Sequence, residues 1–296
     1  MSSYLGVDLG GTKVRVGEVN DKGEIVKVIS SSSFASGTKE DIINNILKLI
    51  NEFDLSNIEG IGIGVPGPVN QKTGSMTMAN NIPALKDVPI VSIIEEKTGK
   101  KTYMENDADV AGLAEAVYGA GKDYDIVYYI THSTGIGGGL IINKRVVSGR
   151  KGFGGEVANV FVKANGIKKN NLIAGAVENE ASGTALALKA KELISDDIKD
   201  AEDVFNLIRN NKSEIADELV EDMSKSIAIL LSDIAAIIAP DCFVIGGGCS
   251  NASELYFHRI EKYFKEYCHD YNNDTPIFKA NIKEPGVIGA SLLAKR

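Results

Sequence analysis

A short polar turn near the start of the chain, Asp8-Leu-Gly-Gly-Thr-Lys13, carries residue types that could bind phosphate. Glycines in a turn let several backbone N–H groups converge on one phosphate oxygen. Thr12 would add a hydroxyl donor and Lys13 a positive charge, and Asp8 could hold a hydrated Mg²⁺. The P-loop pattern GxxxxGK[ST] is absent, so the turn is not a P-loop. The alternative is an ordinary Gly-Gly hairpin with a solvated lysine.

A second glycine turn, Thr134–Gly139, follows another short apolar run. Two turns in matching places could hold the phosphates of ATP between them, because each would present backbone N–H donors. This segment could again be only a flexible hairpin turn. Two such turns in a repeated pattern weaken that alternative.

The pair Asn106-Asp107 lies between a predicted strand and an Ala-rich helix. At the N-terminus of a helix, the dipole favours the charged form of Asp107. A carboxylate with a pKa near ~4 cannot remove an alcohol proton outright, but it can orient the hydroxyl and accept its proton late in phosphoryl transfer. Asp107 would therefore suit the base of an alcohol phosphorylation. Alternatively, the pair only caps the helix, which Asn and Asp do well.

Other carboxylates and carboxamides follow glycine-rich or turn segments and match the donor and acceptor pattern of sugar hydroxyls. They are Asn81, Glu156, Asn159 and Glu178. Each alone could be a solvated loop or turn residue. His132 ends an apolar strand and has no evident nucleophile partner, so we expect it to be structural or to line a cleft.

These residues must be positioned by an α/β fold, because glycine clusters repeatedly follow short apolar runs, where such folds place their ligand loops. Alternating and buried apolar patterns predict strands over Tyr4–Leu9, Val14–Val19, Glu24–Ile29, Ile58–Val65, Lys101–Met104, Ile126–Ile130, Leu140–Val147 and Cys242–Ile245. Helical spacing predicts helices over Lys39–Phe53, Gly183–Ser195, Ala201–Asn210, Ala216–Ile238 and Gly286–Ala294, and an Ala-rich helix ending at Tyr118. Ser182 reads as a helix cap.

The order strand, polar-glycine turn, strand occurs twice, first at 4–19 and again at 126–147. This repetition suggests an internal duplication with a boundary near Gly119–Asp125. We therefore expect an N-terminal α/β domain over 1–118 plus 286–296, and a larger C-terminal α/β domain over 119–285.

The composition excludes several function classes. The chain has 296 residues, 44% of them apolar and 24% charged, which is typical of a globular protein and not of a disordered one. Its net charge of −8 repels nucleic acid and anionic lipid. No apolar run reaches ~18 residues and no signal peptide is visible, so we expect a cytoplasmic protein with three reduced cysteines.

Taken together, the motifs resemble those of the ROK family (repressors, open reading frames and kinases), whose kinases have the actin-like, hexokinase-like fold. In chain order they are DLGGTK at 8–13, GIGVPGPV at 62–69, Asn81-Ile-Pro83, ENDAD at 105–109, STGIGGGL at 133–140, GGEV at 154–157, GAVENEASGTA at 175–185, IGGG at 245–248 and GVIGAS at 286–291. They follow the family's order over essentially the whole chain.

The resemblance implies two domains with ATP and Mg²⁺ in a cleft between them. It implies a catalytic base at Asp107 and sugar contacts at Asn81, Asn106, Glu156, Glu178 and the position of Asn159. It implies nucleotide contacts at Asp8, Gly10, Gly11, Thr12, Lys13, Thr134, Gly135, Gly247 and Gly248, with Asp8 holding Mg²⁺ through water. The products would be ADP and a sugar 6-phosphate.

One departure concerns metal. The family usually has GExGH followed by CxCGxxGCxE, whose histidine and three cysteines bind structural zinc. Here the four positions are Asn159, Lys169, Asn171 and Ala176, which cannot rebuild a tetrahedral Cys/His site, so we expect no zinc. The family's histidine also contacts the sugar. Asn159 is shorter but still donates and accepts hydrogen bonds, which leaves the substrate open.

The sequence thus predicts an ATP-dependent kinase for the 6-hydroxyl of a hexose or N-acetylhexosamine. N-acetylmannosamine is favoured, because zinc-free members resembling this chain occur among those kinases, and glucose is the alternative. A non-catalytic sugar sensor would not need Asp107, and an actin-like filament protein would need no sugar ligands. The resemblance implies a homodimer. Because the first strand begins by Tyr4, we expect no DNA-binding domain ahead of it and no nucleic-acid partner.

Overall fold

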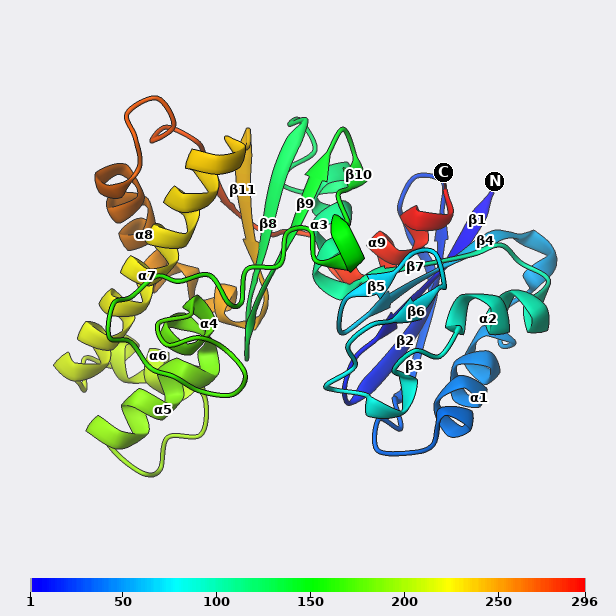
Figure 1. Cartoon of the computed structure of the whole chain (residues 1–296), viewed down its shortest axis with the longest axis horizontal. Coiled ribbons are helices and arrows are strands. Elements are labelled where there is room, and N and C mark those ends of the chain that lie inside the picture. The colour runs from blue at the N-terminus through cyan, green and yellow to red at the C-terminus, as the bar shows by residue number, and fades with distance from the viewer. Residues whose placement is uncertain (1, 296) are drawn as a thin grey trace. The chain divides into compact units, whose positions relative to one another are not determined.

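A computed structural model of the chain describes residues 2–295, which form two compact units (Figure 1). Unit 1 comprises the chain up to Asp123, Gly139–Gly155 and the chain from Ile282 on. Unit 2 comprises Tyr124–Gly138 and Glu156–Asn281.

The first sheet lies in unit 1 and has the strand order β3-β2-β1-β4-β7. The strands are β1 (Ser3–Leu9), β2 (Lys13–Asn20), β3 (Ile25–Ser32), β4 (Ile58–Val65) and β7 (Thr102–Asn106). β1, β2 and β3 pair antiparallel, whereas β4 pairs parallel with both β1 and β7. The carboxyl ends of β1, β4 and β7 therefore meet at one edge of the sheet.

Helices cover both faces of this sheet. They are α1 (Lys39–Ile50), α2 (Ile90–Thr98), α3 (Asp107–Tyr118) and α9 (Pro285–Ala294). Alternate side chains of β1 point to opposite faces, so Leu5, Val7 and Leu9 join a core with apolar residues of α1 and α2. On the other face the backbone of α9 lies very close, because a Cβ placed on Gly62 of β4 would come 1.7 Å from the carbonyl oxygen of Ala290.

The second sheet has the order β10-β9-β8-β11-β12. Its strands are β8 (Ile126–His132), β9 (Ile136–Ile142), β10 (Arg145–Val146), β11 (Cys242–Gly246) and β12 (Ile277–Lys279). Both sheets thus run third-second-first-fourth-fifth in chain order. This shared order confirms the internal duplication that the repeated strand and turn pattern suggested.

Two details of the second hairpin differ from the sequence-based expectation. The predicted glycine turn at 134–139 is Ser133–Gly135 in the structure, because Gly137, Gly138 and Gly139 already belong to β9. The predicted strand Leu140–Val147 is broken at Asn143 and Lys144, both of which have positive φ and form a tight turn between β9 and β10.

The helices of unit 2 are α4 (Val177–Ala181), α5 (Gly183–Leu193), α6 (Ala201–Arg209), α7 (Glu214–Ile238) and α8 (Ser253–Tyr267). Ser182 accepts a hydrogen bond from the Ala185 N–H and so caps α5, as predicted. Smaller elements complete the chain: β5 (Val69–Asn70), β6 (Ser75–Met76) and 3-10 helices at Leu55–Asn57, Pro83–Leu85, Arg150–Gly152 and Gly248–Ala252.

The division into units differs from the predicted domains at Gly139–Gly155, which the sequence assigned to the C-terminal domain. In the structure Ser148 bonds to Glu105, and Gly152 lies so close to Val69 that a Cβ would come 2.4 Å from its carbonyl oxygen. These contacts attach the segment to unit 1. The domain boundaries as such remain a prediction.

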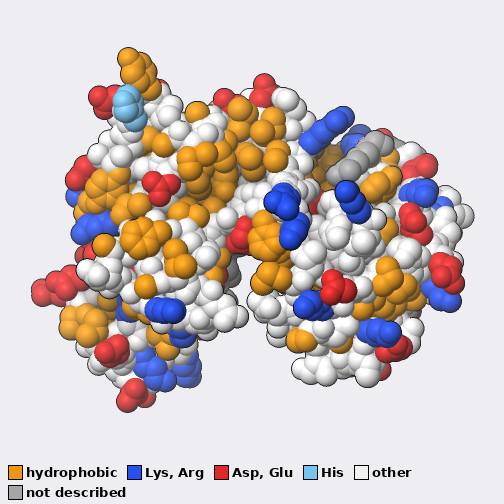
Figure 2. Space-filling view, in the orientation of Figure 1, with side chains coloured by type: hydrophobic (Ala, Val, Ile, Leu, Met, Phe, Trp, Pro, Cys, Tyr) orange, Lys and Arg blue, Asp and Glu red, His pale blue; other side chains and the backbone are white. Residues whose placement is uncertain are grey.

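The surface carries mixed charges. On the face drawn in Figure 2, Lys and Arg side chains are interspersed with Asp and Glu. Cys242, Cys249 and Cys268 are buried thiols. In residues 2–295, none of the helices combines the length and apolar character that crossing a bilayer requires.

Candidate active site

The first glycine turn joins β1 to β2 in unit 1. The Gly10 N–H donates to the Lys13 carbonyl at 2.9 Å, while Gly11, Thr12 and Lys13 are exposed. A Cβ placed on Gly11 would lie 3.7 Å from the Cβ of Asn81. The candidate phosphate turn and one candidate sugar ligand are therefore neighbours.

Asp8 is half-buried at the end of β1. Its Oδ2 lies 3.2 Å from Nη1 of Arg15, whose Nε lies 3.3 Å from Oε2 of Glu284. Burial raises the pKa of Asp8, and the Arg15 guanidinium works against that shift. A half-buried carboxylate of this kind suits a hydrated Mg²⁺. Residues 2–295 contain no cluster of three or more His, Cys, Asp or Glu side chains that could hold a metal.

Asn106 and Asp107 mark the passage from β7 into α3. Asn106 is the N-cap of α3, because its Oδ1 accepts hydrogen bonds from the N–H groups of Ala108 at 2.8 Å and Asp109 at 3.4 Å. Asp107 is the first helical residue, and both side chains are half-buried. The capping alternative thus holds for Asn106. Asp107 is not the N-cap, although its Oδ1 also accepts from the Ala108 N–H at 2.8 Å.

A buried carboxylate that the sequence analysis missed lies next to this pair. Glu105 is 1% exposed, and its Oε2 accepts hydrogen bonds from Nε2 of Gln71 at 2.7 Å and from Oγ of Ser148 at 2.6 Å. Gln71 also donates to the Met104 carbonyl at 2.9 Å. Three segments distant in sequence therefore hold the backbone that leads into Asp107.

The second glycine turn lies in unit 2 and is tied to α5. The Gly183 N–H donates to the Ser133 carbonyl at 2.8 Å, and the Thr184 N–H donates to the Thr134 carbonyl at 3.2 Å. The turn is also tied to a candidate sugar ligand. Oε2 of Glu178 accepts from the Ile136 N–H at 3.0 Å, and a Cβ placed on Gly135 would come 2.5 Å from the same oxygen.

The pKa of Glu178, like that of Asp8, is raised. Burial raises its pKa, the Ile136 N–H lowers it in part, and the negative charge of Glu156 raises it further. Glu156 and Asn159 are exposed at the start of the segment that leads to α4. Oδ1 of Asn159 accepts from the Ile173 N–H at 2.8 Å, so this oxygen already holds the loop.

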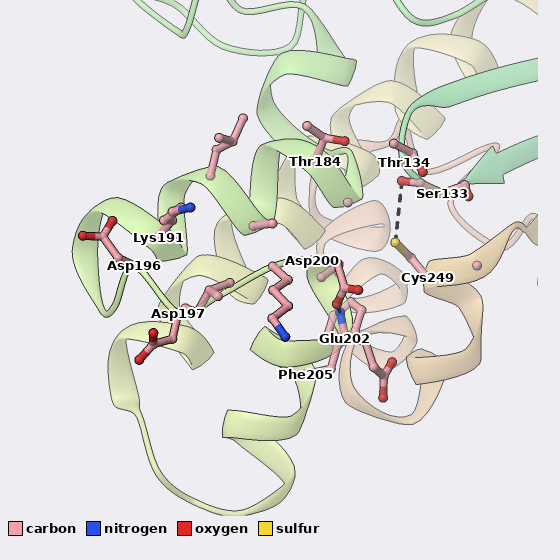
Figure 3. A pocket seen from close by; sticks show the side chains of 17 residues that line it. Ser133, Thr134, Thr184, Lys191, Asp196, Asp197, Asp200, Glu202, Phe205 and Cys249 are labelled. Carbon is pink, nitrogen blue, oxygen red and sulfur yellow. Dashed lines mark hydrogen bonds between the residues drawn. The ribbon is translucent and has the colours of Figure 1, made fainter. Parts of the chain in front are cut away.

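A pocket of about 690 Å³ lies in unit 2 and is lined by α5 and α6 (Figure 3). Thr134, Thr184 and Cys249 lie at one end, and Lys191, Asp196 and Asp197 at the other. Its apolar lining includes Ala187, Leu188, Ile198, Ala201 and Phe205, and its polar lining includes Ser133, Lys199, Asp200, Glu202 and Gly248. Of this set, only Thr134 and Gly248 were predicted as ligands. Ser133 and Thr184 lie in the motifs at 133–140 and 175–185 without a predicted role, and the other residues lie outside the motifs.

Gly247 and Cys249 shape the end of the pocket near the turn. Gly247 has φ 85°, and a Cβ there would come 2.4 Å from the His132 carbonyl oxygen, so only glycine suits this position. The Cys249 Sγ–H donates to the Ser133 carbonyl at 3.7 Å. Burial raises the pKa of this thiol to about 11, so it stays protonated and is not a nucleophile.

His132 is a structural residue, in line with the expectation. It is fully buried, its Nε2 lies 2.9 Å from the Ala181 carbonyl oxygen and its Nδ1 lies 2.9 Å from Oη of Tyr256. Because a carbonyl oxygen can only accept, Nε2 carries the proton and Nδ1 accepts from Tyr256. Burial lowers the pKa of His132 to about 4.

The residues at the family's zinc positions do not fit a zinc ion. Asn159, Lys169, Asn171 and Ala176 offer no thiolate or imidazole, and Asn159 already bonds to the loop backbone. The side chains at these four positions are thus consistent with a loop that binds no zinc. That the protein binds no zinc remains a prediction.

The candidate residues fall into two groups. Unit 1 holds Asp8, Gly10, Gly11, Thr12, Lys13, Asn81, Asn106 and Asp107, and unit 2 holds Thr134, Gly135, Glu156, Asn159, Glu178, Gly247 and Gly248. Comparison with known proteins matches the ROK family model to residues 4–296. The chain belongs to the ROK family. Because the match spans both units, both groups belong to one ROK domain.

Among curated ROK relatives, a glucokinase from Thermotoga maritima is 31% identical over 98% of this chain and 96% of that protein. An N-acetyl-D-glucosamine kinase from Haemophilus influenzae is 29% identical over 86% of each chain.

Solved ROK structures share the fold. A ROK hexokinase from Thermus thermophilus has a TM-score of 0.88 at 29% identity, covering 99% of this chain and 98% of that chain. A Streptomyces griseus ROK glucokinase in complex with glucose and AMPPNP has a TM-score of 0.83 at 27% identity, covering 99% of both. A candidate N-acetylmannosamine kinase from Listeria monocytogenes has a TM-score of 0.82 at 26% identity, covering 99% and 98%. The expected fold, a duplicated actin-like and hexokinase-like α/β architecture, is confirmed.

Proposed function

We propose that this ROK protein is an ATP-dependent sugar kinase that phosphorylates the 6-hydroxyl of a hexose or N-acetylhexosamine. The observation that carries the proposal is Asp107, a half-buried carboxylate at the N-terminus of α3, where Asn106 is the N-cap. The relatives of this chain include a glucokinase and an N-acetylglucosamine kinase, which supports a sugar as the acceptor of the phosphoryl group.

The pocket lined by α5 and α6 supports ATP as the phosphate donor. Its apolar lining suits a purine, and the carboxylates of Asp200 and Glu202 suit ribose hydroxyls. AMPPNP is bound in the related glucokinase structure, which agrees with this assignment. In the proposed reaction, Thr134 and the Gly10–Gly11 turn bind phosphates, and Lys13 offsets their charge.

Asp107 would accept the proton of the sugar 6-hydroxyl as the bond to phosphorus forms. A loose phosphoryl-transfer transition state needs this proton to leave late, so an ordinary carboxylate suffices. Asn81, Asn106, Glu156 and Glu178 would bind the other sugar hydroxyls and hold the acceptor in line. Asp8 would hold the hydrated Mg²⁺, which shields the charge of the phosphates when bound.

We infer N-acetylmannosamine as the preferred sugar, with glucose as the alternative. The loss of the family's zinc ligands supports this choice, because zinc-free members resembling this chain occur among those kinases, and so does the likeness to the Listeria protein. A sugar sensor without turnover is the alternative from another class, and it would not need Asp107.

The test is coupled ADP release with Mg·ATP over glucose, mannose, fructose, N-acetylglucosamine and N-acetylmannosamine. We expect one sugar to raise ADP release and Asp107→Asn to lower kcat about 10²- to 10⁴-fold, the usual value of a general base. Asp21→Asn is the matched control, because Asp21 is exposed beyond Asn20, at the opposite end of β2 from the glycine turn. Sugar binding by calorimetry without any stimulated ADP release would favour the sensor.

A further inference from the structure

The loop between the candidate sugar ligands Glu156 and Glu178 buries apolar side chains near its ends but not in its middle. Val157 and Val162 are 2% and 7% exposed, whereas Ile167 and Ile173 are 41% and 45% exposed. Its two ends are paired through the backbone, for example by the Val177 N–H, which donates to the Val160 carbonyl at 2.8 Å. The middle of the loop is held by the Gly175 N–H, which donates to the Ile167 carbonyl at 3.1 Å, and by a further anchor.

That anchor is a buried amide in α4, directly after Glu178. Asn179 is 5% exposed, and its Nδ2 lies 3.3 Å, 3.4 Å and 3.3 Å from the carbonyl oxygens of Ile167, Lys169 and Ile173. The two N–H bonds of the amide are therefore shared among three carbonyls of the loop. One side chain gathers the same stretch that carries two of the family's zinc positions, 169 and 171.

The next residue adds a charged anchor. Glu180 is 3% exposed, and its Oε1 accepts from the Ile167 N–H at 2.6 Å. Its Oε2 pairs with Nζ of Lys189 on α5 at 3.0 Å, so the buried charge has a partner. Within the loop, Oδ1 of Asn159 accepts from the Ile173 N–H. The side chains of Asn179 and Glu180 thus connect the loop to α4.

We propose that Asn179 and Glu180 hold this loop in the role that zinc has elsewhere in the family, and that Asn179 is a positioning residue for sugar binding. Asn179 acts through its neighbours: it fixes the loop that carries Asn159 and lies beside Glu178, which itself bonds to Ile136. The positioning role rests on the proposed sugar kinase function, whereas the anchoring role does not.

The test compares the intact protein with Asn179→Asp, which keeps the shape of the side chain but has no N–H to donate. We expect hydrogen exchange in peptides covering 161–176 to accelerate at least about tenfold, the effect of losing hydrogen bonds in a partly exposed loop. Exchange in α7 should be unchanged. If the new charge prevents folding, Asn179→Ala gives the same comparison without it.

The kinetic readout separates positioning from general damage. We expect the KM for the sugar to rise about tenfold, with kcat and the KM for ATP within about twofold of their original values. Asn45→Asp is the matched control, because Asn45 likewise joins a helix to a strand by donating to Ser31 Oγ and to the Ser32 carbonyl, but in unit 1.

Unchanged loop exchange in Asn179→Asp would overturn the anchoring role. Loss of protection in the unaltered protein after treatment with a zinc chelator would also overturn it, since a metal would then hold the loop. Faster exchange with an unchanged sugar KM would overturn the positioning role. If no sugar is phosphorylated at all, the proposed function fails while the exchange data still decide the anchor.

Discussion

At the scale of a single side chain, Glu178 of unit 2 is both a candidate sugar ligand and a hydrogen-bond acceptor for the backbone after the second glycine turn. Its carboxylate accepts this hydrogen bond from the Ile136 N–H. Burial and the neighbouring Glu156 both raise its pKa. A raised pKa means that the group binds its proton at a higher pH than a solvated glutamate does.

Sugar binding should therefore weaken early on the acid side. As the pH falls, Glu178 is neutralised above the ordinary glutamate pKa of about 4.3, and an acceptor for a sugar hydroxyl is lost. We expect the sugar KM to begin rising there. In Glu156→Gln the pKa of Glu178, followed by NMR of labelled glutamate, should fall. A value equal to or above that of the original protein would contradict the assigned cause.

His132 should make stability fall in acid. Its pKa is about 4 in the folded chain against 6.5 for an ordinary histidine, so between these values only the unfolded chain binds the proton. The stabilisation is complete above pH 6.5 and decreases as the pH falls to about 4, by at most about 3 kcal/mol. Urea unfolding of His132→Gln should lack this decrease. The exposed His258→Gln is the control and should retain it.

At this scale, residues in glycine turns, such as Thr12 and Thr134, could be predicted as candidates because their type and position together indicate a chemistry. It could not predict the hydrogen bonds of Glu105 to Gln71 and Ser148. Those partners are 34 and 43 residues away, and only the folded chain brings them together. Asn179 lies in the motif at 175–185, but nothing in the sequence indicates that its side chain bonds to three backbone carbonyls of the loop.

The turn between β8 and β9 and the helix α4 act together at the scale of elements. A Cβ at position 135 would displace the Glu178 carboxylate, which is flexible, rather than the backbone. Gly135→Ala should therefore change stability little but raise the KM for both ATP and sugar, because the turn and Glu178 would move apart. In a Glu178→Ala background the same change should add almost nothing. Additive effects of the two substitutions would refute the coupling.

Elements with strong local signals were predicted well and others were missed for physical reasons. β4 and α7 have long apolar patterns that mark them directly. α2 was missed because Ile90, Val91, Ile93 and Ile94 favour strands locally, and packing of Ile90 and Ile94 into the core decides for helix. α8 begins after a 3-10 helix and has no side-chain cap to announce it.

At the scale of the molecule, unit 1 is built from three separate stretches of chain, and its last helix, α9, closes one face of the first sheet. α9 buries Val287, Ala290 and Leu293 completely or nearly so. Burial of the Val287 and Leu293 side chains stabilises the fold by several kcal/mol, which is comparable to the whole stability of a domain. The fold order was predictable because the duplication is visible in sequence, whereas the return of 139–155 to unit 1 was not.

Removing 285–296 should therefore unfold unit 1 and leave unit 2 more resistant. Limited proteolysis should cut within 39–118 and spare 201–267. Removal of residues 295 and 296 alone is the control and should leave the digestion pattern unchanged. Equal protection of both regions in the shorter chain would show that α9 is dispensable.

The stretch from Val157 to Ala176 contains neither cysteine nor histidine. Oxidants inactivate many zinc-thiolate sites by attacking the sulfur and releasing the ion, and this stretch offers them no thiolate to attack. Under the proposed amide anchor, zinc shortage or peroxide would leave this loop in place. The proposed anchor would thus exchange the strength of a metal site for independence from metal supply and redox state.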